Sequence, residues 1–200
     1  WQDEEIQKRL SKWIRVAFAV KVSRNLRVMR FGDNMRDVAV TEGDKVDANI
    51  KLGWEVNTWA VGDLVQQIDS VCDYQLKAQI EEWEKSYENI DINNETIRYQ
   101  ARIECAIEKM LDEFNCSAFT NTFEDLWGMN QLPGIASQDL MRKGYGYGGE
   151  GDWKVAALTH VIKQMGNGEP GGTSFMEDYT YDLENGNELV LGSHMLEVCP

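Results

Sequence analysis

Short β-rich runs alternate with longer amphipathic helical segments along most of this chain, and this alternation limits the possible folds more than any other feature. The runs 26–31 and 54–59 are rich in the branched and aromatic side chains that favour strands. The segments that follow carry apolar residues at helical spacing, such as Ile97, Ala101 and Ile107. Strands separated by helices are typical of a parallel sheet. We therefore predict an α/β fold, with a helix-flanked, mainly parallel sheet in a Rossmann-like central domain.

The individual elements follow from the same periodicities. Residues 45–50 fit neither pattern and are left unassigned. The predicted helices span residues 3–22, 61–70, 73–88, 95–114, 137–143 and 153–165, and the predicted strands span residues 26–31, 38–40, 54–59 and 116–123, with a further glycine-rich strand around Tyr145 and Tyr147.

A glycine-rich stretch at residues 166–172 is the clearest boundary in the chain. After it the pattern changes to two β-rich runs, 174–181 and 188–191, joined by an Asn-Gly turn that is typical of a hairpin. The chain begins at Trp1 rather than at a methionine and stops soon after a strand, so we expect a piece of a longer protein. The predicted parts are 1–22, the terminal helix of a preceding domain; 23–168, the central α/β domain; and 169–200, a linker and the start of an antiparallel β domain.

The charge balance excludes several kinds of partner. The 200 residues include 20 basic and 34 acidic side chains, a net charge of −14, which repels the phosphate backbone of nucleic acids. No apolar run approaches the roughly 18 residues that would span a bilayer, and no basic-then-apolar leader opens the chain. We therefore expect a soluble, cytoplasmic protein with no nucleic-acid and no membrane partner.

Four cysteines, at positions 72, 105, 116 and 199, are scattered along the chain without a CxxC pair. In a domain of this size the pattern favours reduced core thiols over a disulfide framework, metal ligands or a nucleophile. Neither histidine lies close to a cysteine in sequence, although residues distant in sequence can still meet in the fold.

Glu150, Glu177 and His194 are the main candidates for chemistry in this chain. Two carboxylates and an imidazole form a suitable ligand set for a divalent metal that accepts both oxygen and nitrogen. Each residue also has an ordinary interpretation, because a lone glutamate on a strand is usually solvated and a lone histidine is usually a hydrogen-bonded, partly buried side chain. Asp152 and Asp178 lie next to the glutamates, where they either orient the ligands by hydrogen bonding or simply cap a helix and face water.

Glycines at 144, 146 and 149 match the G-x-G-x-x-G string of dinucleotide-binding proteins. That fingerprint requires a strand before it, a helix directly after it and an acidic residue about 20 positions further on. Here a predicted helix precedes the glycines, and Glu169 lies in the glycine-rich linker. We favour a different role, in which the glycines let the backbone pass close to a site and direct Glu150 into it.

Six blocks of sequence carry a resemblance that extends along the whole chain. They are residues 30–36 (RFGDNMR), 56–63 (VNTWAVGD), 122–125 (TFED), 148–154 (GGEGDWK), 171–181 (GGTSFMEDYTY) and 191–199 (LGSHMLEVC). These blocks resemble the signature blocks of the bacterial L-arabinose isomerase family, and they correspond to well under half of a full-length member.

The resemblance implies a manganese site made by Glu150, Glu177 and His194, with the two glutamates also acting as the acid/base pair. Phe123 falls where the family places an aromatic residue against the sugar. The family's fourth ligand is a histidine of the C-terminal domain that has no match here, since the other histidine, His160, lies on a predicted helix outside the blocks. Co²⁺ and Mg²⁺ remain open as alternatives to Mn²⁺, because oxygen-rich sites accept several ions.

The function implied by the resemblance belongs to arabinose catabolism: conversion of L-arabinose to L-ribulose through an ene-diol, with D-galactose to D-tagatose as a side activity. One carboxylate takes the proton from C2 and a second group returns protons, while the divalent ion polarises the carbonyl. Two alternatives stay open: these residues alone form a non-catalytic fragment without the fourth ligand, or the enzyme acts on a related sugar such as fucose or galactose. The family also implies a homo-oligomer, a hexamer with sites near subunit borders.

Overall fold

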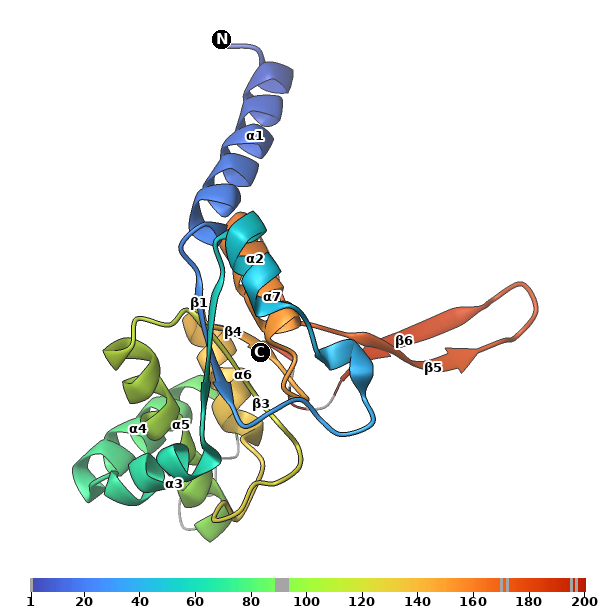
Figure 1. Ribbon diagram of the computed structural model, residues 1–200. Helices are drawn as coiled ribbons and strands as arrows, with labels where there is room; N and C mark the ends of the chain where they lie inside the picture. The colour runs from blue at the N-terminus through green and yellow to red at the C-terminus, as the bar shows by residue number, and fades with distance from the viewer. Residues whose placement is uncertain (1, 89–93, 170, 172, 195, 197) are drawn as a thin grey trace.

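Four parallel strands form the central sheet of the computed structural model, which describes residues 2–88, 94–169, 171, 173–194, 196 and 198–200. The strands are β1 (Arg27–Phe31), β2 (Glu55–Trp59), β3 (Ala118–Asn121) and β4 (Gly146–Gly148), in the spatial order β2-β1-β3-β4. The chain runs from β1 to β2 on one side and then returns past β1 to β3 on the other (Figure 1). In open α/β sheets, ligands bind at the carboxyl ends of strands near such a reversal. The prediction of an α/β fold with a helix-flanked parallel sheet is confirmed.

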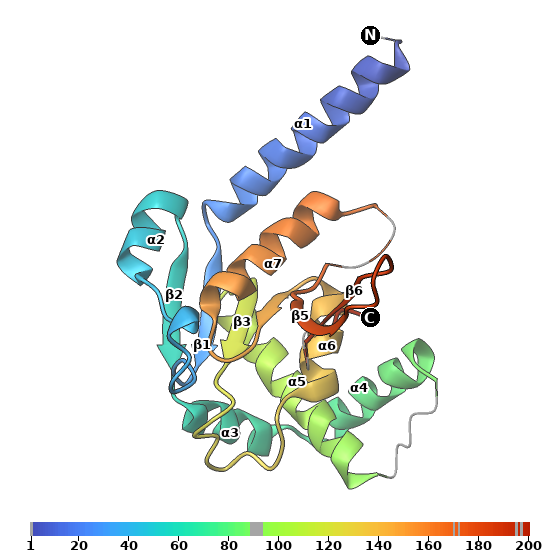
Figure 2. The same cartoon turned by 90° about the vertical axis from the view of Figure 1, so that its right-hand side faces the viewer.

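Helices cover both faces of this sheet. The helices of the described residues are α1 (Glu4–Ser23), α2 (Lys45–Leu52), α3 (Val61–Ser70), α4 (Asp73–Ser86), α5 (Glu95–Glu113), α6 (Gly134–Lys143) and α7 (Trp153–Gly166), of which α1 extends away from the sheet. Because side chains alternate between the two faces of a strand, Met29 and Phe31 of β1 pack in a core shared with α3, α4, α5 and α6. Val28 of the same strand packs with Trp153 of α7 and Ala48 of α2. Figure 2 shows α7 on one side of the sheet and α3, α4 and α5 on the other.

The inner strands carry most of the burial. Strand β3 is buried at every position and β1 at every position but its first, whereas the edge strand β2 is largely exposed. Phe119 of β3 and Tyr147 of β4 stack with their ring centroids 4.9 Å apart, and both are fully buried. A fully buried large apolar side chain contributes about 1.5–3 kcal/mol to the stability of the fold. The buried side chains of β1, β3 and β4 therefore form a hydrophobic core within this part of the chain.

Helix α1 extends away from the sheet as an arm (Figure 1). Asp3 begins it by accepting hydrogen bonds from the backbone N–H groups of Glu5 and Ile6. Arg15 ties the arm to the end of α7 by donating to the carbonyl of Asn167 at 2.8 Å. Several large apolar side chains of α1 are nevertheless open to solvent, and Trp13 is 72% exposed. An apolar helix face of this kind is typical of a surface that packs against something else.

Strands β5 (Glu177–Asp182) and β6 (Leu189–Ser193) form the predicted antiparallel hairpin. Its turn is closed by a hydrogen bond from the N–H of Asn187 to the carbonyl of Glu184, with Gly186 at a positive φ of 84°. Every residue of β5 is exposed, and so is β6 up to the partly buried Ser193. Figure 1 shows the hairpin projecting from the sheet domain. Backbone pairing rather than burial therefore holds the two strands together.

The predicted strand at residues 38–40 is wrong. Ala39–Thr41 form a 3₁₀ turn, η1, in which the Thr41 hydroxyl donates to the carbonyl of Val38 at 2.8 Å. Threonine side chains that bond to nearby backbone compete with strand pairing. The run is rich in β-branched residues, which predicted a strand. Composition carries no information about this local hydrogen bond.

Residues 45–50, which the sequence pattern left unassigned, belong to α2. The Asp44 carboxylate caps this helix by accepting from the N–H groups of Val46 and Asp47, and Gly53 ends it in the left-handed region at φ 77°. Several other boundaries differ from the prediction; for example, α6 begins at Gly134, β3 is limited to Ala118–Asn121, Tyr145 precedes β4, and β5 begins at Glu177 rather than at 174.

Two further expectations concern the cysteines and the membrane. All four cysteines are free thiols, as predicted. Cys116 is buried, but Cys72 is exposed just before α4, so the prediction of a core thiol is wrong there. In the described part of the chain, no helix is long and apolar enough to cross a membrane.

Candidate functional site

A pocket of ≈ 170 Å³ lies at the carboxyl end of β4, where the turn before α7 meets η1 and the base of the hairpin. All three candidate metal ligands face this pocket. It is lined by Val40, Thr41, Gly149, Glu150, Asp152, Val155, Phe175, Glu177 and His194. Segments distant in sequence therefore contribute carboxylates, an imidazole and an apolar wall to one small cavity.

The backbone around Glu150 makes a sharp turn between β4 and α7. Glu150 has a positive φ of 60° and Gly151 one of 79°, a left-handed conformation that costs a non-glycine residue energy and recurs at functional sites. The carbonyl of Glu150 accepts from the N–H of Met35 at 2.9 Å, and the N–H of Gly151 donates to the carbonyl of Asn121 at 2.9 Å. The loop after β1 and the last residue of β3 thus fix the position of Glu150.

Close backbone approach explains the glycines near this turn. A Cβ atom on Gly146 would lie 2.2 Å from the carbonyl oxygen of Ala156 in α7, and one on Gly151 would lie 2.4 Å from that of Asp33. Gly144 ends α6 in the left-handed region, so a helix precedes the glycine string, as the sequence predicted. The glycines let β4 lie directly against α7 and let the turn that holds Glu150 contact the loop after β1.

Glu177 and His194 meet because the hairpin brings its two ends together. Glu177 opens β5 opposite Ser193, the last residue of β6, and His194 follows directly. The Nε2 atom of His194 lies 3.9 Å from a carboxylate oxygen of Glu177. The His194 side chain is buried and its ring packs against the edge of Phe175, with centroids 5.5 Å apart. Strand register, rather than distance along the chain, makes them neighbours.

The side chains of this pocket are of the chemical types that bind a divalent metal ion, but they are not arranged closely around one point. Two carboxylates and one imidazole suit an ion such as Mn²⁺. As the side chains lie here, however, no group of three or more His, Cys, Asp or Glu residues in the described ranges is close enough to hold a metal ion. Glu177 and His194 form a close pair, and Glu150 lines the same cavity. The ligand set therefore remains a prediction.

Asp152 and Asp178 occupy different environments. One carboxylate oxygen of Asp152 accepts from the N–H groups of Lys154 and Val155 at 2.9 and 3.1 Å, which caps α7, and the side chain also lines the pocket. Asp178 lies on the exposed strand β5 and is not one of the pocket residues. Asp152 thus caps α7 and also lines the pocket, whereas Asp178 is exposed.

Two other residues considered in the sequence lie outside the pocket. Phe123 is half-buried just after β3 and does not line the cavity. His160 is buried on α7, where its Nδ1 lies 3.1 Å from the carbonyl of Gly144. Burial lowers the pKa of His160, which favours the neutral ring. Neither residue joins Glu150, Glu177 and His194 in this structure.

Sequence patterns missed the residues that build the walls of the pocket. Val40 was assigned to a strand, Thr41 lay beyond that predicted strand, and Val155 has the appearance of an ordinary helix residue. Phe175 falls inside one of the recognised blocks, and that is the one signal that pointed to it. Val40, Thr41 and Val155 could not be predicted from spacing, because they come together only when η1 packs against α7.

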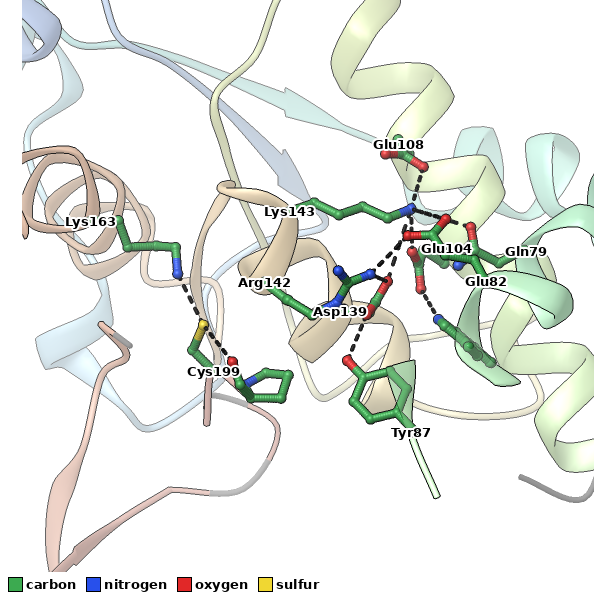
Figure 3. A network of polar contacts seen from close by, with 12 residues as sticks. Gln79, Glu82, Tyr87, Glu104, Glu108, Asp139, Arg142, Lys143, Lys163 and Cys199 are labelled. Carbon is green, nitrogen blue, oxygen red and sulfur yellow. Dashed lines mark hydrogen bonds and ion pairs between the residues drawn. The ribbon is translucent and has the colours of Figure 1, made fainter. Parts of the chain in front are cut away.

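Polar contacts of Leu196 and Cys199 attach the segment that follows His194 to the central domain. The Ser137 hydroxyl of α6 donates to the carbonyl of Leu196 at 3.1 Å, and Leu196 has a positive φ of 69°. Lys163 of α7 lies 3.0 Å from the sulfur of Cys199 (Figure 3). Leu196 also packs against the core beneath α6. These contacts hold the chain that carries His194 against the sheet domain.

A second polar cluster lies among α4, α5 and α6 (Figure 3). The fully buried Glu104 accepts from the indole of Trp83 at 3.1 Å and lies 2.8 Å from the Lys143 ammonium. Asp139 accepts from Arg142 and from the Tyr87 hydroxyl, each at 2.6 Å.

Burial raises the pKa of Glu104 to about 9. It also acts to raise the pKa of Asp139, but hydrogen bonds from Arg142, Glu104 and Tyr87 outweigh it and lower that pKa. Perturbed groups often mark functional sites. Here each carboxylate has its own donors, so we interpret the cluster as structural.

The sheet, the turn at Glu150 and the hairpin define an α/β protein with a carboxylate–imidazole pocket between its sheet domain and a β segment. The family profile for the L-arabinose isomerase central domain matches residues 27–168, and the profile for the C-terminal domain of the same enzyme matches residues 172–200. The chain belongs to the L-arabinose isomerase family. The family resemblance seen in the sequence blocks is confirmed.

Curated relatives match the chain from end to end. It is 56% identical to the L-arabinose isomerase of Geobacillus stearothermophilus over 206 aligned residues, 56% to that of Salmonella arizonae over 206, and 54% to that of Thermotoga petrophila over 202. Each alignment covers 100% of this chain and 41% of the relative. The chain therefore spans about two fifths of the length of the curated relatives that it matches.

Proposed function

We propose that this chain is part of an aldose–ketose isomerase that converts L-arabinose to L-ribulose. The observation that carries the proposal is the 56% identity to an enzyme named L-arabinose isomerase over the whole of this chain. Because the alignment covers the entire chain, it includes the pocket and all three candidate residues. D-galactose to D-tagatose conversion is proposed as a side activity of the same site.

Glu150 and Glu177 are proposed as the acid/base pair. Both line the pocket, so a sugar bound there would lie within reach of two carboxylates. One takes the proton from C2 of the open-chain sugar and the other assists its return to C1, through an ene-diol. Phe175 and Val155 supply apolar surface beside these groups, which helps to exclude water from the proton transfer.

Glu150, Glu177 and His194 are also proposed to hold one divalent cation, Mn²⁺ in the first instance, with Co²⁺ or Mg²⁺ as alternatives. When bound, such an ion would polarise the substrate carbonyl and stabilise negative charge on the sugar oxygens. The 3.9 Å separation of His194 and Glu177 supports their acting together. The fourth ligand implied by the family has no counterpart in this chain. Phe123 is proposed to contact the sugar, and Asp178 to orient a ligand.

The wider setting is also a proposal. The enzyme would work in arabinose catabolism in the cytoplasm, as a homo-oligomer that the family resemblance suggests is a hexamer. The net charge of −14 disfavours nucleic acid as a partner. A second candidate is that these 200 residues alone bind metal weakly and do not catalyse, because the fourth ligand is missing. The similarity to named isomerases gives that alternative no support for the parent enzyme.

An isomerase assay on this chain with L-arabinose and added Mn²⁺ tests the proposal by measuring L-ribulose. Turnover would support the proposal, and Glu150→Gln or Glu177→Gln should then reduce kcat by about 10²–10⁴-fold, the usual contribution of a general acid or base. Leu183→Ala, on the exposed hairpin outside the pocket, is a matched control that should keep the rate. Parallel rates with D-galactose and L-fucose decide the sugar preference.

Mn²⁺ binding provides a separate readout. The paramagnetic resonance signal of free Mn²⁺ should fall as the chain binds the ion, and His194→Ala should weaken that binding. No turnover with measurable Mn²⁺ binding would favour the non-catalytic fragment. Equal Mn²⁺ binding by the wild type and His194→Ala would remove His194 from the ligand set.

A further inference from the structure

The ammonium group of Lys154 joins two walls of the pocket. It donates to the carbonyl of Val40 at 3.0 Å and to the carbonyl of Glu42 at 2.6 Å, and it lies 3.2 Å from a carboxylate oxygen of Asp152. Val40 and Asp152 both line the pocket. A lysine ammonium has three donors, so these acceptors use all of them.

The segment after η1 packs closely on the start of α7. A Cβ atom on Gly43 would lie 2.8 Å from the Trp153 ring and 3.0 Å from the Lys154 side chain. The Lys154 ammonium also lies 5.4 Å from the centre of that ring, within the range of a cation–π contact. The fit at Gly43 and the hydrogen bonds of Lys154 thus fix the same segment from two sides.

Charge makes these contacts stronger than ordinary hydrogen bonds. A charged donor to a carbonyl forms a shorter and stronger bond than a neutral one, and the Lys154 side chain is 35% exposed, so water weakens it only in part. The two carbonyls belong to Val40 and Glu42, the residues on either side of Thr41, and Thr41 itself is 3% exposed. Loss of the ammonium would release this segment from α7.

We propose that Lys154 is a positioning residue for this site: it holds the Val40–Thr41 wall against Asp152 and so sets the width of the cavity that faces Glu150, Glu177 and His194. The inference rests on the proposed isomerase function for its kinetic consequence. Lys154 is placed outside the acid/base pair, so its loss should impair substrate binding more than the proton transfer itself.

Two variants of Lys154 and one control variant test this positioning role. Lys154→Met keeps the length of the side chain but cannot donate, whereas Lys154→Arg keeps the charge and can restore part of the contacts. Lys77→Met, at a surface position on α4, is the matched control. Hydrogen exchange of this chain follows the N–H groups of Thr41 and Glu42, which bond to the carbonyls of Val38 and Ala39.

In Lys154→Met we expect exchange at Thr41 and Glu42 to quicken by about tenfold, the effect of losing charge-assisted hydrogen bonds, with Lys154→Arg intermediate and Lys77→Met unchanged. We expect KM for L-arabinose to rise about tenfold and kcat to stay within about twofold. Unchanged exchange would overturn the proposal, and so would a fall in kcat at constant KM. If the wild type shows no turnover, the proposed function fails for this chain, and the exchange result alone decides the role of Lys154.

Discussion

The central sheet and the β-hairpin differ in what supports them. Strands β1 and β3 are buried between two helical layers, whereas β5 and most of β6 are exposed along their length. Yet Glu177 and His194 lie at the base of the exposed hairpin, and Glu150 lies at the end of a packed strand. One half of the candidate site is therefore rigidly packed, and the other is held by a few contacts around Ser137, Lys163 and Phe175. We therefore expect that changes in the hairpin can disturb the candidate site without a large loss of unfolding free energy.

The difference in support between the two regions is tested most directly by removing one large aromatic side chain from each. Trp83→Ala, at a fully buried position, should cost about 3–5 kcal/mol of unfolding free energy, because it leaves a cavity and takes a donor from Glu104. Tyr181→Ala on β5, where the side chain is 53% exposed, should change stability by about 0.5 kcal/mol or less. Urea unfolding measures both. Similar losses would mean that the hairpin is buried in solution.

Glycine substitutions test the packing of β4 against α7. Gly146→Ala should destabilise by about 1–3 kcal/mol, since the new methyl group would collide with the Ala156 carbonyl and His160. Gly62→Ala in α3 meets nothing within 4 Å and should stabilise by about 0.5–1 kcal/mol through helix propensity. Thermal unfolding shows whether each substitution lowers or raises the melting temperature. A neutral Gly146→Ala would show that the strand and helix are further apart than described.

The pH dependence of stability reports on the buried cluster of the packed region. Burial raises the pKa of Glu104 from 4.5 to about 9, so its contribution is fully present below pH 4.5 and is lost as the pH rises toward 9. Between pH 7 and 9 the unfolding free energy should fall by up to about 1.4 kcal/mol per pH unit, the slope of one proton.

Glu104→Gln should flatten that slope relative to the wild type in urea titrations at several pH values. Glu108→Gln, the neighbouring carboxylate at 3.0 Å from Lys143, is the control and should keep the slope. Parallel curves for the wild type and Glu104→Gln would show that Glu104 is ionised in the folded protein.

The smallest expected effect separates two aspartates that the sequence treated alike. Asp152→Ala removes the cap of α7 and should cost about 1 kcal/mol, while Asp152→Asn should keep most of the stability. Asp178→Ala, on the exposed strand, should be near neutral. Melting temperatures provide the comparison. A destabilised Asp178→Ala would indicate a structural contact for that side chain.

Local sequence signals were sufficient for the sheet and most helices, because the runs at 26–31 and 54–59 are rich in strand-forming side chains and the stripe around Ile103 has helical spacing. Periodicity missed α2, although Asp44 and Gly53 are ordinary helix boundary signals. It misplaced residues 38–40 because the hydrogen bond of Thr41 to Val38 is not visible in composition.

The candidate site was only partly predictable. Glu150, Glu177 and His194 do line one pocket, and their ligand chemistry together with the family blocks singled them out. The Val40–Thr41 wall and the Glu104–Lys143 contact each depend on how separate helices pack. Helical and strand periodicities carry no information about such contacts, since they arise only in the assembled fold.

Strands β1 and β3 lie side by side, although α2, β2, α3, α4 and α5 separate them along the chain. Closing so long a loop costs entropy before any contact repays it, and parallel pairing of this kind is slow. The hydrogen bonds from Met35 to Glu150 and from Gly151 to Asn121 need β1, β3 and β4 already in place. We therefore expect the pocket to be among the last features to form during folding.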